Sequence, residues 1–296
     1  MTHETIETGI VIPIDKPYQW TSFQTVNKVK SIIRHHLDIK KFKIGHAGTL
    51  DPLATGLLLV CVGKATKSIE TLQAGEKEYT GTMVLGATTP CYDMEQAIDR
   101  YYPYEHIDAE KIEQARRLFV GEIEQVPPMF SAVKIAGQRA YEYARADDPT
   151  ATITAKRVEV MSFEITGYRP GKVLDESERA ALTGEGGGGK SGMRGVEMGE
   201  DGAEKGRRIE EGDSGEKSRR GGKPHLYDSP EGSVPPYLPQ IDFRIRCSKG
   251  TYIRSIARDM GIAMQTGAFL ASLRRESIGT FHVAEAVDFD KITERY

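Results

Sequence analysis

The sequence contains no run of about 18 apolar residues, the length that a membrane-spanning helix needs. Its first residues, Met1–Gly9, are polar and acidic, whereas a secretory signal begins with basic residues followed by an apolar run. Cysteine is scarce, and Cys61, Cys91 and Cys247 are widely spaced without a CxxC pair. This spacing argues against a disulfide framework and against a structural zinc site. We therefore expect a protein of the reducing cytoplasm that does not cross or enter a membrane.

The chain also lacks the large positive charge that is typical of proteins binding polyanions. Its 40 Lys and Arg against 43 Asp and Glu give a net charge of -3 over 296 residues. However, residues 16–67 carry nine basic and two acidic residues, and residues 241–276 carry seven basic and three acidic residues. Residues 68–170 compensate with 11 basic and 17 acidic residues. Two basic segments are the pattern that a polyanion-binding face needs, although solvated lysines on ordinary helices explain the charges as well.

Residues 171–232 differ in composition from the remainder of the chain. They hold 16 of the 31 glycines, and their 11 basic and 14 acidic residues account for the whole net charge. With almost no apolar residues and no periodicity, this segment cannot offset its ordering entropy by burial. We predict a disordered, low-complexity insertion in a domain formed by residues 1–170 and 233–296. Two roles for this insertion stay open: a solvated linker, or an RNA-binding segment around Lys217–Lys223.

Apolar patterns outside the insertion predict strands scattered among helices. Alternating or continuous apolar residues indicate strands at residues 10–12, 57–62, 78–85, 158–165 and 241–247. Helical spacing indicates helices after Thr21-Ser22, over 109–119, and after a cap at Thr251, with a glycine-rich loop from Gly45 to Pro52. Mostly alternating strands favour an α+β fold in which helices pack on a mixed, largely antiparallel sheet.

The densest group of unusual residues is Gly45–Gly56. Its glycines allow the backbone to approach a ligand closely, and Pro52 stiffens the segment. Asp51 has apolar neighbours on both sides, so its carboxylate is expected to be partly desolvated and to need a cationic partner. Such a carboxylate is a candidate nucleophile or acid/base. An aspartate that only organises an X-Pro turn explains the motif as well.

The segment Gly45–Lys67, which reads GHAGTLDPLATGLLLVCVGKATK, resembles the catalytic motif of the TruB family of pseudouridine synthases, which isomerise uridine 55 in the T-loop of tRNA. Further matches to the family follow its order along the chain: Asp15–Pro17 with Thr21-Ser22, Lys77–Gly81, Pro127-Pro128, Phe130–Lys134, Cys247–Ser255 and Leu273–Arg275. The matches lie in residues 10–170 and 240–281, nearly everything outside the insertion. The resemblance implies the pseudouridine synthase fold with a central RNA-binding cleft.

The resemblance also implies roles for six residues. Asp51 falls on the catalytic aspartate, Tyr79 on the active-site tyrosine, and Arg254 on the arginine that pairs with the aspartate. Three others fall on positions that shape the uridine pocket and hold the displaced RNA: His46, Tyr252 and Leu273. The substrate implied is the T-stem-loop of tRNA. Because this isomerisation involves no net redox change and no group lost, we expect no cofactor, no metal and no required protein partner. Without coiled-coil heptads in the sequence, we expect a monomer.

Elementary chemistry is consistent with these roles, although purely structural roles for the same residues stay open. Arg254 offers a planar fork to a carboxylate, and Tyr79 offers a ring for stacking and a hydroxyl for proton transfer. No acidic or histidine partners at metal-ligand spacing surround His46, so a planar wedge that fills the gap left by a flipped base suits it better. The alternatives are a surface arginine, a core tyrosine, a loop histidine bonded to backbone and, for Leu273, core packing.

The basic segments then become candidates for phosphate contacts, which position an RNA without reading its sequence. The candidates are Lys28, Lys30, Lys40, Lys41, Lys43, Lys64, Arg244, Arg246, Arg274 and Arg275.

Two departures from the family pattern stand out. Gln19 occupies the position where the family usually has glycine, which puts the shape of that loop in question. The short stretch after Arg275 is expected to be too small for the C-terminal RNA-binding (PUA) domain that many relatives carry. Besides the tRNA isomerase, we considered a non-catalytic tRNA-binding folding assistant and a related synthase that acts on rRNA with guide RNA and protein partners.

Overall fold

The computed structural model describes residues 1–131, 133–135, 137–145, 153–172, 175 and 234–296. Of these, residues 1–172 and 234–296 belong to one compact unit. The predicted disordered insertion at 171–232 lies outside the described residues apart from positions 171, 172 and 175. Its disorder, and the division of the chain that rests on it, therefore stay predictions.

The described part of the chain mixes helices with strands, as predicted. The α-helices among the described residues are α1 (His3–Thr8), α2 (Ser22–Leu37), α3 (Ile69–Ala74), α4 (Ala109–Arg117), α5 (Ala140–Arg145), α7 (Ile253–Ala263) and α8 (Ile292–Arg295). The strands are β1 (Ile10–Lys16), β2 (Ile44–Ala47), β3 (Thr55–Val62), β4 (Lys77–Leu85), β5 (Ala87–Thr88), β6 (Arg100–Tyr101), β7 (Gly121–Gln125), β8 (Lys134–Ile135), β9 (Gln138–Arg139), β10 (Lys156–Arg169), β11 (Gln240–Cys247), β12 (Ala268–Ile278) and β13 (Phe281–His282). None of these helices is long and apolar enough to cross a membrane.

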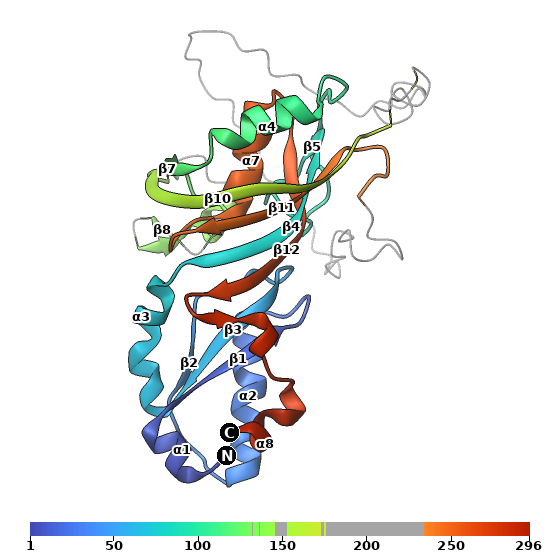
Figure 1. Cartoon of the computed structure of the whole chain (residues 1–296). Helices are drawn as coiled ribbons and strands as arrows, with labels where there is room; N and C mark the ends of the chain where they lie inside the picture. The colour runs from blue at the N-terminus through green and yellow to red at the C-terminus, as the bar shows by residue number, and fades with distance from the viewer. Residues whose placement is uncertain (132, 136, 146–152, 173–174, 176–233) are drawn as a thin grey trace, which may run out of the picture. The chain divides into compact units, whose positions relative to one another are not determined.

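One large sheet organises the fold (Figure 1), with the strand order β1-β3-β12-β4-β11-β10-β7. β2 pairs with β3 and β13 pairs with β12 at its sides. All of these pairs are antiparallel except β3 with β12, which run parallel. The prediction of a mixed, largely antiparallel sheet is therefore confirmed.

The parallel pairing of β3 with β12 is short, because only Thr55 with Arg274 and Gly56 with Arg275 are in register. On one side of this junction, α2 and the C-terminal segment pack against β1 and β3 around Val29, Ile33 and Ile292. On the other side, α4 and α7 cover the strands from β12 to β10. Two apolar cores thus flank the place where the chain enters β3.

Both chain ends lie beside α2 and α8 (Figure 1), where the Met1 ammonium donates to the carbonyl of Thr293 at 2.9 Å. The helix predicted after Thr21 is confirmed. The Thr21 side chain accepts from Gln24 N, and the Gln24 side chain accepts from Thr21 N, which forms a capping box.

Two local predictions are wrong. Residues 45–47 of the predicted loop belong to strand β2 (Ile44–Ala47), because they pair with β3. Thr251 is not the cap of α7: Tyr252 takes that position without a side-chain cap, and the Thr251 hydroxyl donates to Ser248 O at 3.0 Å. The predicted glycine-rich loop before Pro52 therefore begins at Gly48 and not at Gly45.

The departure at Gln19 leaves the backbone in a conformation that glycine adopts readily. Gln19 has φ 65, in the left-handed region that costs a residue with a Cβ about 1–2 kcal/mol. Neighbouring Trp20 stacks on Phe289 with ring centroids 5.5 Å apart. This contact ties the loop to the C-terminal segment and helps to offset the backbone cost.

Candidate active site

The loop Gly48–Ala54 connects β2 to β3 and contains Asp51, the predicted catalytic carboxylate. Two of its apolar side chains, Leu50 and Ala54, are buried in the larger core. The Ser22 hydroxyl at the start of α2 accepts from Leu50 N at 2.9 Å and donates to Leu50 O at 3.1 Å. These contacts anchor both sides of Asp51, whose side chain stays 40% exposed.

Asp51 faces a cavity of about 380 Å³, within the usual range for small-molecule sites. Its walls come from the Asp51 loop, β4, β12 and the turn before α7. The lining residues include Asp51, Lys77, Tyr79, Ser131, Tyr252, Arg254, Leu273 and Arg275. Five of the six residues singled out from the sequence therefore share one cavity.

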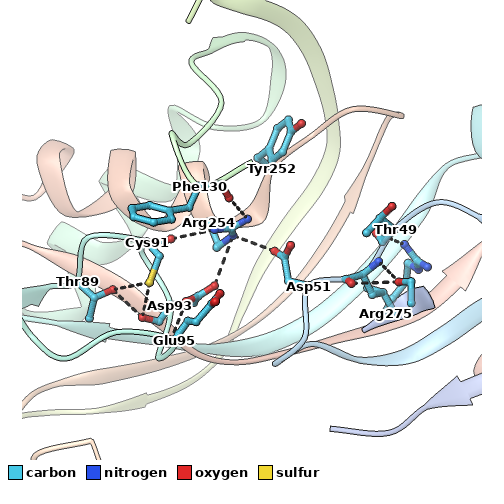
Figure 2. Close-up of polar contacts among 12 residues, drawn as sticks. Thr49, Asp51, Thr89, Cys91, Asp93, Glu95, Phe130, Tyr252, Arg254 and Arg275 are labelled. Atoms are coloured by element: carbon cyan, nitrogen blue, oxygen red, sulfur yellow. Dashed lines mark hydrogen bonds and ion pairs between the residues drawn. The ribbon is translucent and has the colours of Figure 1, made fainter. Parts of the chain in front are cut away.

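Arg254 lies in the first turn of α7 and is only 5% exposed. Its Nε atom lies 2.9 Å from an Asp51 carboxylate oxygen, as Figure 2 shows. The guanidinium also donates to Cys91 O at 3.2 Å and to Phe130 O at 2.9 Å. Although burial opposes its charge, the carboxylates of Asp51 and Asp93 raise the pKa of Arg254. The arginine is therefore a fixed cation that orients the Asp51 carboxylate.

Asp93 is a second carboxylate beside Arg254, and it was not identified from the sequence. It is buried, and its Oδ2 lies 3.6 Å from Arg254 Nε on the side away from Asp51 (Figure 2). Glu95 N donates to its other oxygen at 2.9 Å. Burial raises the pKa of Asp93, and the Arg254 charge opposes that rise. One guanidinium therefore bridges an exposed and a buried carboxylate.

Tyr79 lies on β4 and is buried, with part of its side chain lining the cavity. Burial raises the pKa of Tyr79, while the charge of Arg275 acts in the opposite direction. A raised pKa keeps the phenol protonated at neutral pH, so its hydroxyl is a hydrogen-bond donor.

Tyr252 and Leu273 also line this cavity. The Tyr252 backbone N–H donates to Gln125 Oε1 at 2.7 Å, and Gln125 Nε2 donates to Tyr252 O at 3.1 Å. Burial raises the pKa of Tyr252, and the nearby Asp51 charge adds to the effect. Leu273 is partly buried against the larger core, so it belongs both to the core and to the cavity wall.

His46 does not line the cavity. It lies on β2 opposite Val60 of β3, with its Nδ1 atom buried and without a hydrogen-bond partner in the described part of the chain. Burial lowers the pKa of His46, so its ring is neutral at pH 7. The structure thus separates His46 from the other five predicted site residues.

The candidate phosphate contacts divide into two groups. Arg244, Arg246 and Arg274 form ion pairs with Glu78, Glu76 and Asp15, and Arg275 is buried, so the prediction that Arg275 contacts phosphate is wrong. The six lysines form no ion pair among the residues that the structure describes: Lys28, Lys30, Lys40, Lys41, Lys43 and Lys64. Among these ten candidates, the lysines therefore remain as the unpaired surface cations in the part of the chain that the structure describes. No group of three His, Cys, Asp or Glu able to hold a metal occurs in the described ranges.

Comparison with known proteins gives consistent matches along the chain. Residues 34–178 match the TruB family pseudouridylate synthase (N-terminal domain). The tRNA pseudouridine synthase B of Flavobacterium johnsoniae is 41% identical over 295 residues, which cover 99% of each chain. The protein of the same name from Phocaeicola vulgatus is 37% identical over 286 residues, covering 97% of this chain and 92% of that protein.

A solved structure shares the fold at lower identity. The crystal structure of a Cbf5-Nop10-Gar1 complex contains a chain that matches with a TM-score of 0.52 and 23% identity. The match covers 94% of this chain and 51% of that one. The sheet with its flanking helices is therefore a known architecture.

Proposed function

Because the chain belongs to the TruB family of pseudouridylate synthases and is an isomerase, we propose that it converts uridine 55 in the T-loop of tRNA to pseudouridine. The relatives named tRNA pseudouridine synthase B match almost the whole chain. The observation that carries the residue-level proposal is the Asp51–Arg254 ion pair of 2.9 Å at the wall of a nucleotide-sized cavity.

The reaction leaves the composition of the RNA unchanged. The N1–C1′ bond of uridine breaks, the uracil turns, and C5 bonds to C1′. C5 then loses its proton and N1 gains one. No electrons leave or enter the substrate, and no group is transferred to another molecule.

The proposed roles follow from the charges around the cavity. As the glycosidic bond breaks, positive charge develops at C1′, and the Asp51 carboxylate either attacks that atom or stabilises the charge. Arg254 keeps this carboxylate aimed at the cavity through the ion pair. The protonated Tyr79 offers a ring to the uracil and a hydroxyl for the proton transfer at C5.

A stacked base has to leave its stack before its glycosidic bond can reach Asp51, so the proposal includes base flipping. Tyr252 and Leu273, on the cavity wall with Tyr79, supply the apolar surfaces that would hold the flipped base. His46 lies outside that wall, and its proposed role is to contact the RNA from which the base has left.

Tritium release from tRNA labelled at uridine C5 tests this function, because forming the C5–C1′ bond frees the C5 hydrogen. We expect release from a T-loop with uridine 55 and none when cytidine replaces that uridine. Asp51→Asn should lower the single-turnover rate by a factor of about 10³ or more.

Asp288→Asn is the matched control, because Asp288 is exposed, forms an ion pair with Lys291 at 3.0 Å and does not line the cavity. It should keep the wild-type rate. An Asp51→Asn variant as fast as the wild type would contradict the catalytic role. A wild-type chain that binds tRNA without releasing tritium would favour the folding assistant. Release that requires added guide RNA and partner proteins would favour the synthase acting on rRNA.

A further inference from the structure

Arg275 is a buried arginine that reaches both ends of the Asp51 loop. It lies on β12, is 1% exposed, and its Nε donates to Leu57 O at 2.8 Å, just beyond the loop. Its Nη2 donates to Gly48 O at 3.1 Å, and its Nη1 approaches Thr49 O at 3.4 Å, just before Asp51. One side chain therefore fixes the backbone on either side of the carboxylate (Figure 2).

The main chain reinforces this contact at the junction of β3 with β12. Arg275 is in register with Gly56 of β3 on one side and with Tyr79 of β4 on the other. A Cβ atom at Gly56 would lie 2.3 Å from Arg275 O, so only glycine permits this approach. The arginine therefore sits between β3, which follows the Asp51 loop, and β4, which carries Tyr79.

The charge of Arg275 has no carboxylate partner within ion-pair distance among the described residues. Burying an uncompensated charge costs several kcal/mol, whereas an apolar side chain of similar volume would fill the same space more cheaply. Its field also reaches functional groups around it: it lowers the pKa of Tyr79 against the larger effect of burial. Packing alone therefore does not account for a guanidinium at this site.

We propose that Arg275 is a positioning residue for the isomerisation: it braces the Asp51 backbone and sets the charge around the Tyr79 hydroxyl. The proposal rests on the function proposed above. Arg254 orients the Asp51 side chain, while Arg275 holds the main chain from which that side chain extends. A displacement of about 1 Å at a reacting group can cost about 100-fold in rate, so both restraints matter for turnover.

Two substitutions separate the hydrogen bonds of Arg275 to the loop backbone from its positive charge. Arg275→Lys keeps a cation but loses the planar fork, and Arg275→Gln loses the charge. The single-turnover rate should fall roughly 10-fold in Arg275→Lys and roughly 100-fold in Arg275→Gln. The dissociation constant for tRNA should change less than about threefold in both variants. Arg116→Gln is the matched control, because Arg116 also donates to a backbone carbonyl, Phe163 O, but does not line the cavity.

A second measurement responds to the charge and not to folding. With 3-fluorotyrosine placed at position 79, the fluorine NMR shift follows ionisation of that phenol. Its pKa should be higher in Arg275→Gln than in the wild type, because the cation favours the phenolate, and Arg275→Lys should lie nearer the wild type. Thermal unfolding confirms that each variant is folded under the conditions of measurement.

Unchanged single-turnover rates in folded Arg275 variants would overturn the proposal. Lower rates without any change in the pKa of the phenol at position 79 would overturn it as well. If the wild type itself releases no tritium, the proposed function fails. In that case the Tyr79 titration alone decides whether Arg275 controls this site.

Discussion

At the scale of single residues, the site depends on how one guanidinium is shared. Arg254 lies 2.9 Å from a carboxylate oxygen of exposed Asp51 and 3.6 Å from one of buried Asp93. Asp93 balances the arginine charge from inside, so the guanidinium has a carboxylate neighbour besides Asp51. Each of its two terminal nitrogens donates to a neutral backbone carbonyl, Nη1 to Cys91 O and Nη2 to Phe130 O.

Lys16 is, with Arg254 and Arg275, a third buried cation next to the Asp51 loop. It is 0% exposed, and its ammonium donates to three carbonyls: Pro17 O at 2.9 Å, Trp20 O at 2.6 Å and Pro52 O at 3.0 Å. Burial lowers the pKa of Lys16 from 10.5 to about 8, although the charges of Asp51 and Asp15 oppose the shift. Its proton is therefore released from the folded chain at lower pH than from the unfolded chain.

This shift predicts a pH-dependent stability. Below about pH 8, both the folded and the unfolded chain hold the proton; between about pH 8 and 10.5, only the unfolded chain does. The contribution of Lys16 to the free energy of unfolding therefore rises with pH in this window, by at most about 1.4 kcal/mol per pH unit. Urea unfolding of the wild type and Lys16→Met measures it.

We expect the wild type to gain stability over Lys16→Met between about pH 7 and pH 9.5. Lys77 has a similarly lowered pKa of about 8, but it is present in both proteins and cancels in the difference. A stability difference that stays constant with pH would contradict the prediction.

The residue types at the site could be predicted from the sequence only in part. The position of Asp51 in its motif identified it, and the resemblance supplied Tyr79 and Arg254. Asp93 was not identified at all, and Arg275 was identified only as a candidate phosphate contact, because the positions of both depend on burial next to residues that are distant in the sequence. His46 shows the opposite case: it lies within the motif but outside the cavity wall.

At the scale of elements, α2 holds the Asp51 loop through its first residue. Thr21 caps the helix, while Ser22 exchanges two hydrogen bonds with the Leu50 backbone. Thr21 thus stabilises the helix, whereas its neighbour Ser22 holds the Asp51 loop. A pair of alanine substitutions can distinguish the two roles.

Thr21→Ala removes the cap and should cost about 1 kcal/mol of stability with little effect on turnover. Ser22→Ala leaves the buried N–H and C=O of Leu50 unpaired and should cost about 1–3 kcal/mol. It should also lower the single-turnover rate roughly tenfold, because the Asp51 loop loses an anchor. Denaturant unfolding and tritium release measure both effects. If the two variants had equal turnover, Ser22 would have no role in positioning the loop.

Element prediction succeeded where the apolar pattern was regular and failed at β12. The alternating residues of β4 and β11 appear as strands in the structure. β12 contains Arg274 and Arg275 in its middle and has register shifts against β4 after Leu270 and Arg275. These irregularities break the period of two that identifies a strand. The buried arginine that holds the site is thus also the reason that its strand was missed.

At the scale of the whole molecule, the surface cations differ in whether they are paired. Arg117, Arg157 and Arg169 each lie against an acidic side chain. The cations of α2 have no such partners in the described ranges, and the helix itself contains no acidic residue. At its first turn, Phe23 is 69% exposed. A cationic helix with an exposed aromatic ring next to the Asp51 loop suits a nucleic acid backbone and its bases.

This contrast predicts how salt weakens tRNA binding. Replacing Lys28, Lys30 and Arg34 together with Gln should reduce the slope of log affinity against log salt by roughly 0.7–0.9 for each phosphate that the helix no longer neutralises. Replacing Arg117, Arg157 and Arg169 with Gln changes the net charge equally, but those arginines already neutralise protein carboxylates. Filter binding across a salt series should therefore give a shallower slope for the α2 variant and a nearly wild-type slope for the control. Equal slopes for the two variants would mean that the total charge of the molecule, and not the unpaired face of α2, governs its attraction to RNA.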